Sequence, residues 1–166
     1  RQLEEVTFRR TVIPVQELLD TAGKYFKKSM KNRSERIELE IEPMEAKVIG
    51  DVNQLRFLLE NLIDEALTVR EDGVIRLQAR KDNEYVRFLF TDTRREKSVE
   101  ELNQLFYPNL ARMTSGEKGE LRGTEYLVCK QIIRDHDEFA GRRGCRINAE
   151  PAEGGGFTVY FTIPRR

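Results

Sequence analysis

DVNQLRFLLENLIDEALTVR, residues 51–70, carries the clearest structural pattern in the chain. Its apolar residues recur at intervals of three and four, which is the spacing of one face of an α-helix. The apolar stripe is wide enough for a helix in the centre of a core, and it comprises Val52, Leu55, Leu58, Leu59, Leu62, Ile63, Ala66 and Val69. Asp51, with Gln54 three residues later, predicts a capping box at the start. The stretch therefore predicts a central amphipathic helix.

Two further long helices are predicted, one on each side of this stretch in the sequence. Residues 14–31 have Pro14 in the first turn, followed by apolar residues at helical spacing. Residues 123–136 have the same spacing, and residues 98–106 predict a shorter helix with a Ser-x-x-Glu start. The other face of the first helix carries lysines, which we expect to face solvent: Lys24, Lys27, Lys28 and Lys31.

Strand patterns fill the spaces between these helices. Residues 36–42 alternate strictly between charged and apolar side chains, as a half-buried strand does. The other predicted strands are 47–50, 74–80, 84–91, 145–150 and 157–163. Because neighbouring strands mostly join as hairpins and the helices are few and long, we expect an α+β fold, a two-layer sandwich with three longer helices on one face of a four- or five-stranded mixed sheet. The 166 residues suit a single domain, 1–166.

Composition excludes several classes of protein. Lys plus Arg and Asp plus Glu are 29 each, so the chain lacks the basic excess of a nucleic-acid binder. Two cysteines and one histidine are too few for a disulfide scaffold, a histidine zinc site or a catalytic triad. No apolar run approaches the roughly 20 residues of a membrane helix. We expect a cytoplasmic domain, the C-terminal part of a longer signalling protein, and membrane anchoring of that parent is left open.

Six short motifs follow one another in a recognisable order. They are Gly50 to Leu55, Asn61 to Ala66, Phe90 to Thr93, Leu105 to Pro108, Gly123 to His136, and the closing hairpin from Arg146 to Pro164. In this order the chain resembles the ATP-binding (catalytic) domain of sensor histidine kinases, in the GHKL superfamily. The resemblance runs from about Val6 to Pro164 and implies a histidine-kinase-like ATPase fold.

The resemblance also implies where a nucleotide pocket would lie. The corresponding positions are Asn61, Glu65, Asp92, Thr93 and Gly123. Asp92 stands where the family reads adenine, and Glu65 stands where it holds Mg²⁺. The implied cofactors of a working pocket are therefore ATP and Mg²⁺, with Glu65 as the metal ligand. We expect Glu65, Asp92 and Glu125 to converge on one groove beneath a mobile lid, residues 108–122.

Several of these positions depart from the family pattern. Glu65 replaces an asparagine and Thr68 a cation, so a triphosphate would meet an extra negative charge. The family's DTGxG reads Asp92-Thr-Arg-Arg-Glu96 here, and Glu125 replaces a glycine of the last phosphate-binding box. Glycines at these places let the backbone approach the ligand closely.

Two functional hypotheses follow. The first is a noncatalytic domain with no cofactor and no catalytic residue, which acts through protein contacts with a preceding dimerisation segment of the same protein or with other signalling proteins. It makes no contact with nucleic acid or membrane. The alternative is a functional ATP-binding kinase domain with a divergent pocket, helped by the lid cations Arg112 and Lys118. In both, His136 is expected to be a partner of its helix C-terminus rather than a catalyst, and Cys129 a core residue.

Overall fold

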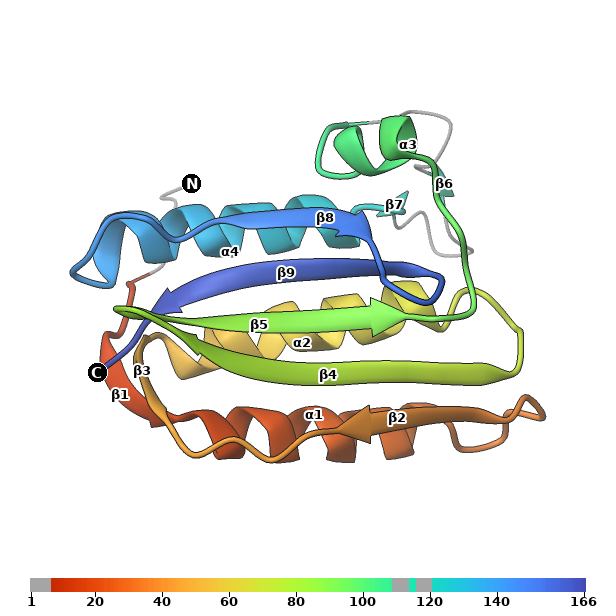
Figure 1. Ribbon diagram of the computed structural model, residues 1–166, viewed down its shortest axis with the longest axis horizontal. Helices are drawn as coiled ribbons and strands as arrows, with labels where there is room; N and C mark the ends of the chain where they lie inside the picture. The colour runs from red at the N-terminus through yellow and green to blue at the C-terminus, as the bar shows by residue number, and fades with distance from the viewer. Residues whose placement is uncertain (1–6, 109–113, 116–120) are drawn as a thin grey trace, which may run out of the picture.

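A five-stranded sheet carries one layer of helices in the computed structural model, which describes residues 7–108, 114–115 and 121–166 (Figure 1). The sheet order is β2 (Ile37–Ile41), β4 (Gly73–Asp82), β5 (Tyr85–Asp92), β9 (Phe157–Pro164) and β8 (Ile147–Pro151). β2 and β4 pair in parallel, and the other neighbours pair antiparallel. The predicted mixed sheet is therefore confirmed.

Three long helices cover one face of this sheet, as predicted (Figure 1). They are α1 (Val15–Ser29), α2 (Val52–Ala66) and α4 (Glu125–Phe139), and the short α3 (Val99–Asn103) lies beside β8. The inward faces of the helices and the alternate residues of β5 and β9 form the core, in which the rings of Phe88 and Phe161 stack 4.8 Å apart. Pro14 lies at the N-cap of α1 rather than in its first turn.

Four short strands stand outside the main sheet. β1 (Thr11–Pro14) pairs with β3 (Lys47–Gly50), and β6 (Thr114–Ser115) pairs with β7 (Leu121–Arg122). The sequence predicts β3 but not β1, which runs directly into α1 and is a strand only through its pairing with the distant β3. The expected mobility of the lid concerns residues 108–122, most of which lie outside the described residues.

The start of α2 differs from the expected capping box. The Asp51 side chain accepts hydrogen bonds from the backbone N–H groups of Asn53 and Gln54, as a cap should. The backbone N–H of Asp51, however, donates to Nε2 of His136 at 3.1 Å instead of to the Gln54 side chain. The His136 ring is fully buried, so it fixes the junction of β3 and α2 against α4 rather than acting only at the end of its own helix.

The direction of the chain places the ends of two helices and one strand at the same end of the molecule. The C-terminal ends of α2 and β5 and the N-terminal end of α4 all lie at the same end of the molecule (Figure 1). Glu65, Asp92 and Glu125 belong to these ends. None of the helices in the described ranges is long and apolar enough to cross a membrane.

Candidate functional site

Asp92, the last residue of β5, is the centre of the candidate site. It is 1% exposed, and both of its carboxylate oxygens accept hydrogen bonds from neighbouring arginines. Oδ1 accepts from the backbone N–H of Arg94 at 3.0 Å and from its Nε at 2.9 Å. Oδ2 accepts from the terminal nitrogen of Arg94 at 2.9 Å and from Nε of Arg95 at 3.1 Å. The carboxylate that would read adenine is thus fully engaged within the protein.

Arg94 continues from this carboxylate to the end of α2. One terminal nitrogen donates to the carbonyl of Ala66 at 2.7 Å, and the other donates to the carbonyls of Val69 and Glu71 at 2.9 Å. The end of a helix leaves carbonyls without partners, and a cation there is favourable. The Arg94 side chain is only 1% exposed and passes so close to Gly73 that a Cβ there would lie 2.6 Å from Arg94 Cγ. The Arg94 side chain therefore fills the space between Asp92, Gly73 and the end of α2.

Arg95 joins Asp92 to Glu65 on α2. Its terminal nitrogen lies 2.8 Å from Oε2 of Glu65, and its guanidinium lies 5.3 Å from the ring centroid of Phe157. Burial opposes the charge of Arg95, but the hydrogen bond and attraction of Glu65 outweigh burial and raise the pKa of Arg95 above its usual value. The guanidinium of Arg95 therefore balances the negative charge of Glu65.

Tyr126, in the first turn of α4, completes the network. Its hydroxyl donates to Oε2 of Glu65 at 2.6 Å. Burial, together with the negative charge of Glu65, raises the pKa of Tyr126 well above its usual value. The phenol stays protonated and holds the start of α4 against the end of α2.

The remaining predicted site residues form hydrogen bonds within the protein. The amide of Asn61 donates to the carbonyl of Phe57 at 2.8 Å, and the hydroxyl of Thr93 donates to the carbonyl of Val74 at 2.6 Å. Gly123 has φ of +81° and donates its N–H to Oε1 of Glu125 at 3.3 Å.

The structure thus brings Glu65 and Asp92 together, with Arg95 between them. Glu125 neighbours Tyr126 in the chain, and its Oε2 is buried with no hydrogen-bond partner among the described residues. Arg112 and Lys118 lie outside the described residues, as do ten positions of the expected lid, 109–113 and 116–120.

Sequence reasoning missed the two arginines as partners of Asp92 and Glu65. It treats Arg94 only as a lost glycine, whereas the side chain itself occupies the site. The available signal was the pair of arginines directly after an apolar strand that ends in aspartate, because a buried carboxylate needs a cation close by. Tyr126 as a donor to Glu65 could not be inferred from spacing, since the two residues lie on different helices.

These side chains, as they stand, do not fit a purine or Mg²⁺. Both oxygens of Asp92 accept two hydrogen bonds each, and Oε2 of Glu65 accepts from Arg95 and Tyr126. No group of three or more His, Cys, Asp or Glu side chains with metal-binding geometry occurs in the described ranges. What the site forms instead is a network in which ion pairs join α2 to the end of β5 and the hydrogen bond from Tyr126 joins α4 to α2.

Comparison with a known family gives a match over most of the chain. The sequence model described as "Histidine kinase-, DNA gyrase B-, and HSP90-like ATPase" matches residues 50–166. No curated protein sequence matches this chain.

Solved histidine kinase structures have a similar fold. The nucleotide-free catalytic domain of ThkA is 21% identical with a TM-score of 0.72, over 95% of this chain and 97% of that one. The mycobacterial sensor kinase MprB is 19% identical with a TM-score of 0.71, over 95% of this chain and 99% of that one. At these identities the similarity shows the fold alone.

Two larger assemblies contain a similar domain. Full-length ShkA in complex with AMPPNP is 16% identical with a TM-score of 0.72, over 96% of this chain and 32% of that one. ThkA in complex with the response regulator TrrA is 20% identical with a TM-score of 0.71, over 98% of this chain and 44% of that one.

Proposed function

The chain belongs to the family of histidine kinase-, DNA gyrase B- and HSP90-like ATPases, and from this we propose that it is a noncatalytic domain of a two-component-type signalling protein. In this proposal the domain keeps the family fold, holds no nucleotide and acts through protein contacts. The observation that carries the proposal is the buried Arg94 side chain, whose guanidinium engages Asp92 and whose aliphatic stem lies against Gly73.

The energy needed to displace Arg94 supports this proposal. A purine that used Asp92 would have to break a buried ion pair, and removing one partner of such a pair costs about 3–5 kcal/mol. A micromolar ligand has only about 8 kcal/mol of binding free energy. A loss of this size would weaken a micromolar affinity to about millimolar. The repulsion that the sequence predicts from Glu65 is offset by Arg95, so the main obstacle is Arg94.

We propose two kinds of partner, a dimerisation segment preceding this domain in the same protein or other signalling proteins. ThkA, which has a similar fold, has been solved in complex with the response regulator TrrA. We further propose a cytoplasmic location, and no contact with nucleic acid, because positive and negative residues balance at 29 each.

The second candidate function is a working ATP-binding domain. One observation favours it: ShkA, which contains a domain of similar fold, has been solved in complex with AMPPNP. In this chain, the same role would require Arg94 to leave Asp92 when the nucleotide arrives.

Calorimetric titration with Mg-ATP separates the two functions. We expect no isotherm for the wild-type chain at micromolar nucleotide. A dissociation constant below about 50 μM would overturn the proposal and favour the working domain.

A gain-of-binding variant makes the test sharper. Arg94→Gly combined with Glu96→Gly restores the family's DTGxG pattern and removes the guanidinium. We expect this variant to bind Mg-ATP at least about tenfold more tightly than the wild type. The matched control is Arg142→Gly with Glu84→Gly, which removes an exposed pair at 3.8 Å and leaves the net charge equally unchanged. Equal affinity in all three proteins, each shown to be folded by circular dichroism, would contradict the role given to Arg94.

A further inference from the structure

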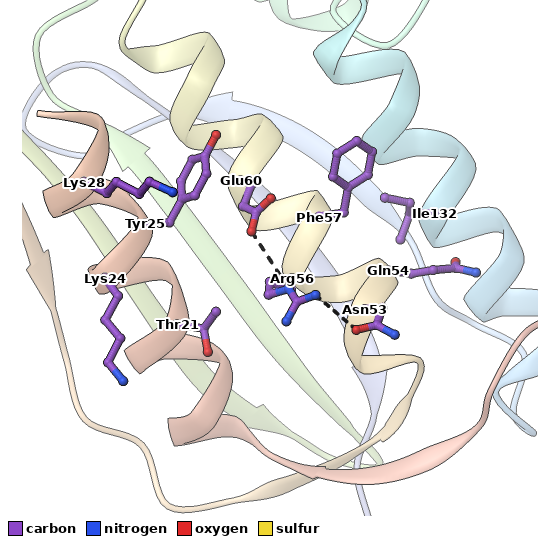
Figure 2. Close-up of a pocket in the computed structure, with 10 residues that line it drawn as sticks. All are labelled: Thr21, Lys24, Tyr25, Lys28, Asn53, Gln54, Arg56, Phe57, Glu60 and Ile132. Atoms are coloured by element: carbon purple, nitrogen blue, oxygen red, sulfur yellow. Dashed lines mark hydrogen bonds and ion pairs between the residues drawn. The ribbon is translucent and has the colours of Figure 1, made fainter.

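A groove on the outer side of the helical layer is separate from the Asp92 site. Figure 2 shows it between α1 and α2, extending over α2 to Ile132 of α4, with a volume of about 620 Å³. α1 contributes Thr21, Lys24, Tyr25 and Lys28, and α2 contributes most of the other side. The residues of this groove take no part in the network of Asp92, Arg94 and Glu65.

The charge of the groove is mainly positive. Lys24, Lys28 and Arg56 line it, against the single carboxylate of Glu60. Arg56 lies 3.9 Å from Glu60, whereas Lys24 and Lys28 form no ion pair with any described residue. Tyr25 donates its hydroxyl to Asp64 at 2.6 Å, so that nearby carboxylate is already occupied. The two ammonium groups of Lys24 and Lys28, one helical turn apart, are therefore available to pair with carboxylates of a partner.

An apolar anchor lies on the opposite side of the groove from the two lysines, next to α4 (Figure 2). Phe57 is 51% exposed, which is unusual for a phenylalanine, and it points toward Ile132 in Figure 2. Oε1 of Gln54, at the same side of the groove, is buried and has no hydrogen-bond partner among the described residues. Aromatic side chains are enriched at the centre of protein interfaces, so the exposed Phe57 ring is suited to anchor an apolar side chain of a partner.

The spacing of the two lysines indicates the secondary structure of a binding partner. Lys24 and Lys28 stand four residues apart on α1, and a helix lying alongside presents side chains at the same interval. Side chains of a third helix can interdigitate with the ridges of two neighbouring helices. We propose that this groove binds an acidic amphipathic helix of a partner protein, with carboxylates four residues apart on Lys24 and Lys28 and an apolar side chain against Phe57. The inference rests on the proposed role in protein contacts and names the chemistry of the contact.

A pair of charge reversals on α1 tests this proposal. The probe is a synthetic helical peptide of about 18 residues, made of Glu, Leu and Ala with glutamates four residues apart, measured by fluorescence anisotropy at about 50 mM salt. We expect Lys24→Glu with Lys28→Glu to weaken its binding at least about tenfold. The matched control, Lys27→Glu with Lys31→Glu, changes the net charge equally, at one lysine of α1 and one just after its end. These lysines do not line the groove, and we expect less than about a twofold effect.

A second variant tests the apolar anchor. Phe57→Ala should weaken peptide binding about fivefold or more with an unchanged melting temperature, because the ring is half exposed. Val99→Ala, at a residue that is 61% exposed elsewhere on the surface, should have no effect.

Four results would overturn the groove proposal. They are the absence of binding at about 200 μM peptide, equal losses in both lysine pairs, equal binding of a peptide with lysine in place of glutamate, and a wild-type dimer that Phe57→Ala dissociates. The last result would identify the occupant as a second copy of the chain. Failure here is distinct from failure of the proposed function, because the Mg-ATP titration has its own readout and does not involve these residues.

Discussion

At the scale of single residues, the pairing of buried charges determines which substitutions the folded protein tolerates. Asp92 and Arg94 have side chains 2% and 1% exposed, and each provides the charge that the other requires. A buried pair of this kind is neutral in net stability when both members are present, but it becomes strongly destabilising when one member is left alone.

Arg94→Ala should lower the free energy of unfolding by about 3 kcal/mol, the lower end of the usual range because Arg95 still faces Asp92. Urea denaturation measures this change. Arg76→Ala, in an ion pair whose side chains are 46% and 56% exposed, is the control and should cost no more than about 1 kcal/mol. The double variant Arg94→Ala with Asp92→Ala should lose less than the sum of the two single changes. Equal effects of Arg94→Ala and Arg76→Ala would refute the buried pair as a stability determinant.

The buried His136 makes stability depend on pH. Burial lowers the pKa of His136, although its hydrogen bond to Ile132 and the nearby carboxylate of Asp51 act in the opposite direction. Nδ1 lies 2.8 Å from the carbonyl of Ile132 and must donate, because Nε2 accepts the N–H of Asp51. A proton on Nε2 would place two N–H groups face to face.

The folded protein should therefore be most stable with His136 neutral. Because the folded pKa lies below the unfolded value of about 6.5, this stability is fully present above pH 6.5 and is lost as the pH falls through the folded pKa. The slope contributed by His136 is at most about 1.4 kcal/mol per pH unit, and urea denaturation from pH 7.5 to 5 measures it. His136→Asn should flatten this slope, since the sequence has one histidine. An unchanged slope in that variant would assign the effect to other groups.

The same residues explain why the site was only partly predictable. Motif order is enough to bring Glu65 and Asp92 close together, because chain direction and topology bring the ends of α2 and β5 to the same end of the molecule. The direction of a side chain after the end of a strand depends on the space around it, and motif spacing carries no information about that space. Arg94 turns toward the carbonyl of Ala66, and only the three-dimensional arrangement reveals it.

At the scale of elements, the two capped helices differ in what their caps support. Asp51 caps α2, which lies between α1 and α4, and it also accepts the N–H of Arg9 at 3.0 Å. Ser98 caps the five-residue α3 at the edge of the fold through a reciprocal capping box with Glu101.

Asp51→Ala should cost about 1–2 kcal/mol of global stability, because three backbone N–H groups lose their acceptor. Ser98→Ala should cost about 0.5–1 kcal/mol and act mainly on α3, which native-state hydrogen exchange can resolve. Asp51→Asn is the conservative control and should retain most of the stability. A larger global loss for Ser98→Ala than for Asp51→Ala would contradict this ranking.

Elements with a long periodic pattern were predictable in existence, whereas their exact ends and the strand β1 were not. α2 is evident from its apolar stripe, yet it ends at Ala66 rather than at Arg70. Arg94 donates hydrogen bonds to the carbonyl of Ala66, the last residue of the helix, and to that of Val69 just after it. α4 begins at Glu125 and continues to Phe139, beyond the predicted 123–136, because the residues after His136 still satisfy helical hydrogen bonds. β1 depends on pairing with β3, a contact that no local pattern encodes.

At the scale of the whole molecule, the two thiols report on how cooperatively the fold opens. Cys129 is fully buried on α4, and Cys145, before β8, is 7% exposed. Burial raises the pKa of both thiols, that of Cys145 to about 12, so the reactive thiolate is scarce in the folded state.

Neither cysteine should react with Ellman's reagent in the native protein, and both should become reactive along the urea unfolding curve. The measurement is the absorbance of the released thiolate against urea concentration, with fully unfolded protein as the control for two thiols. Rapid labelling of one thiol without denaturant would instead indicate local opening around that residue.

The position of β9 in the sheet has a consequence for biosynthesis. β9 lies between β5 and β8, although it is the last strand in the chain (Figure 1). A ribosome produces about 5–20 residues per second, so β5 waits some seconds for its partner after it has left the exit tunnel. During that time the hydrogen-bonding edge of Tyr85–Asp92 is open, and its apolar residues Val86, Phe88 and Phe90 lack the strand that pairs with them. We therefore expect the nascent chain to expose this strand edge, a surface that chaperones can shield, until β9 has been synthesised.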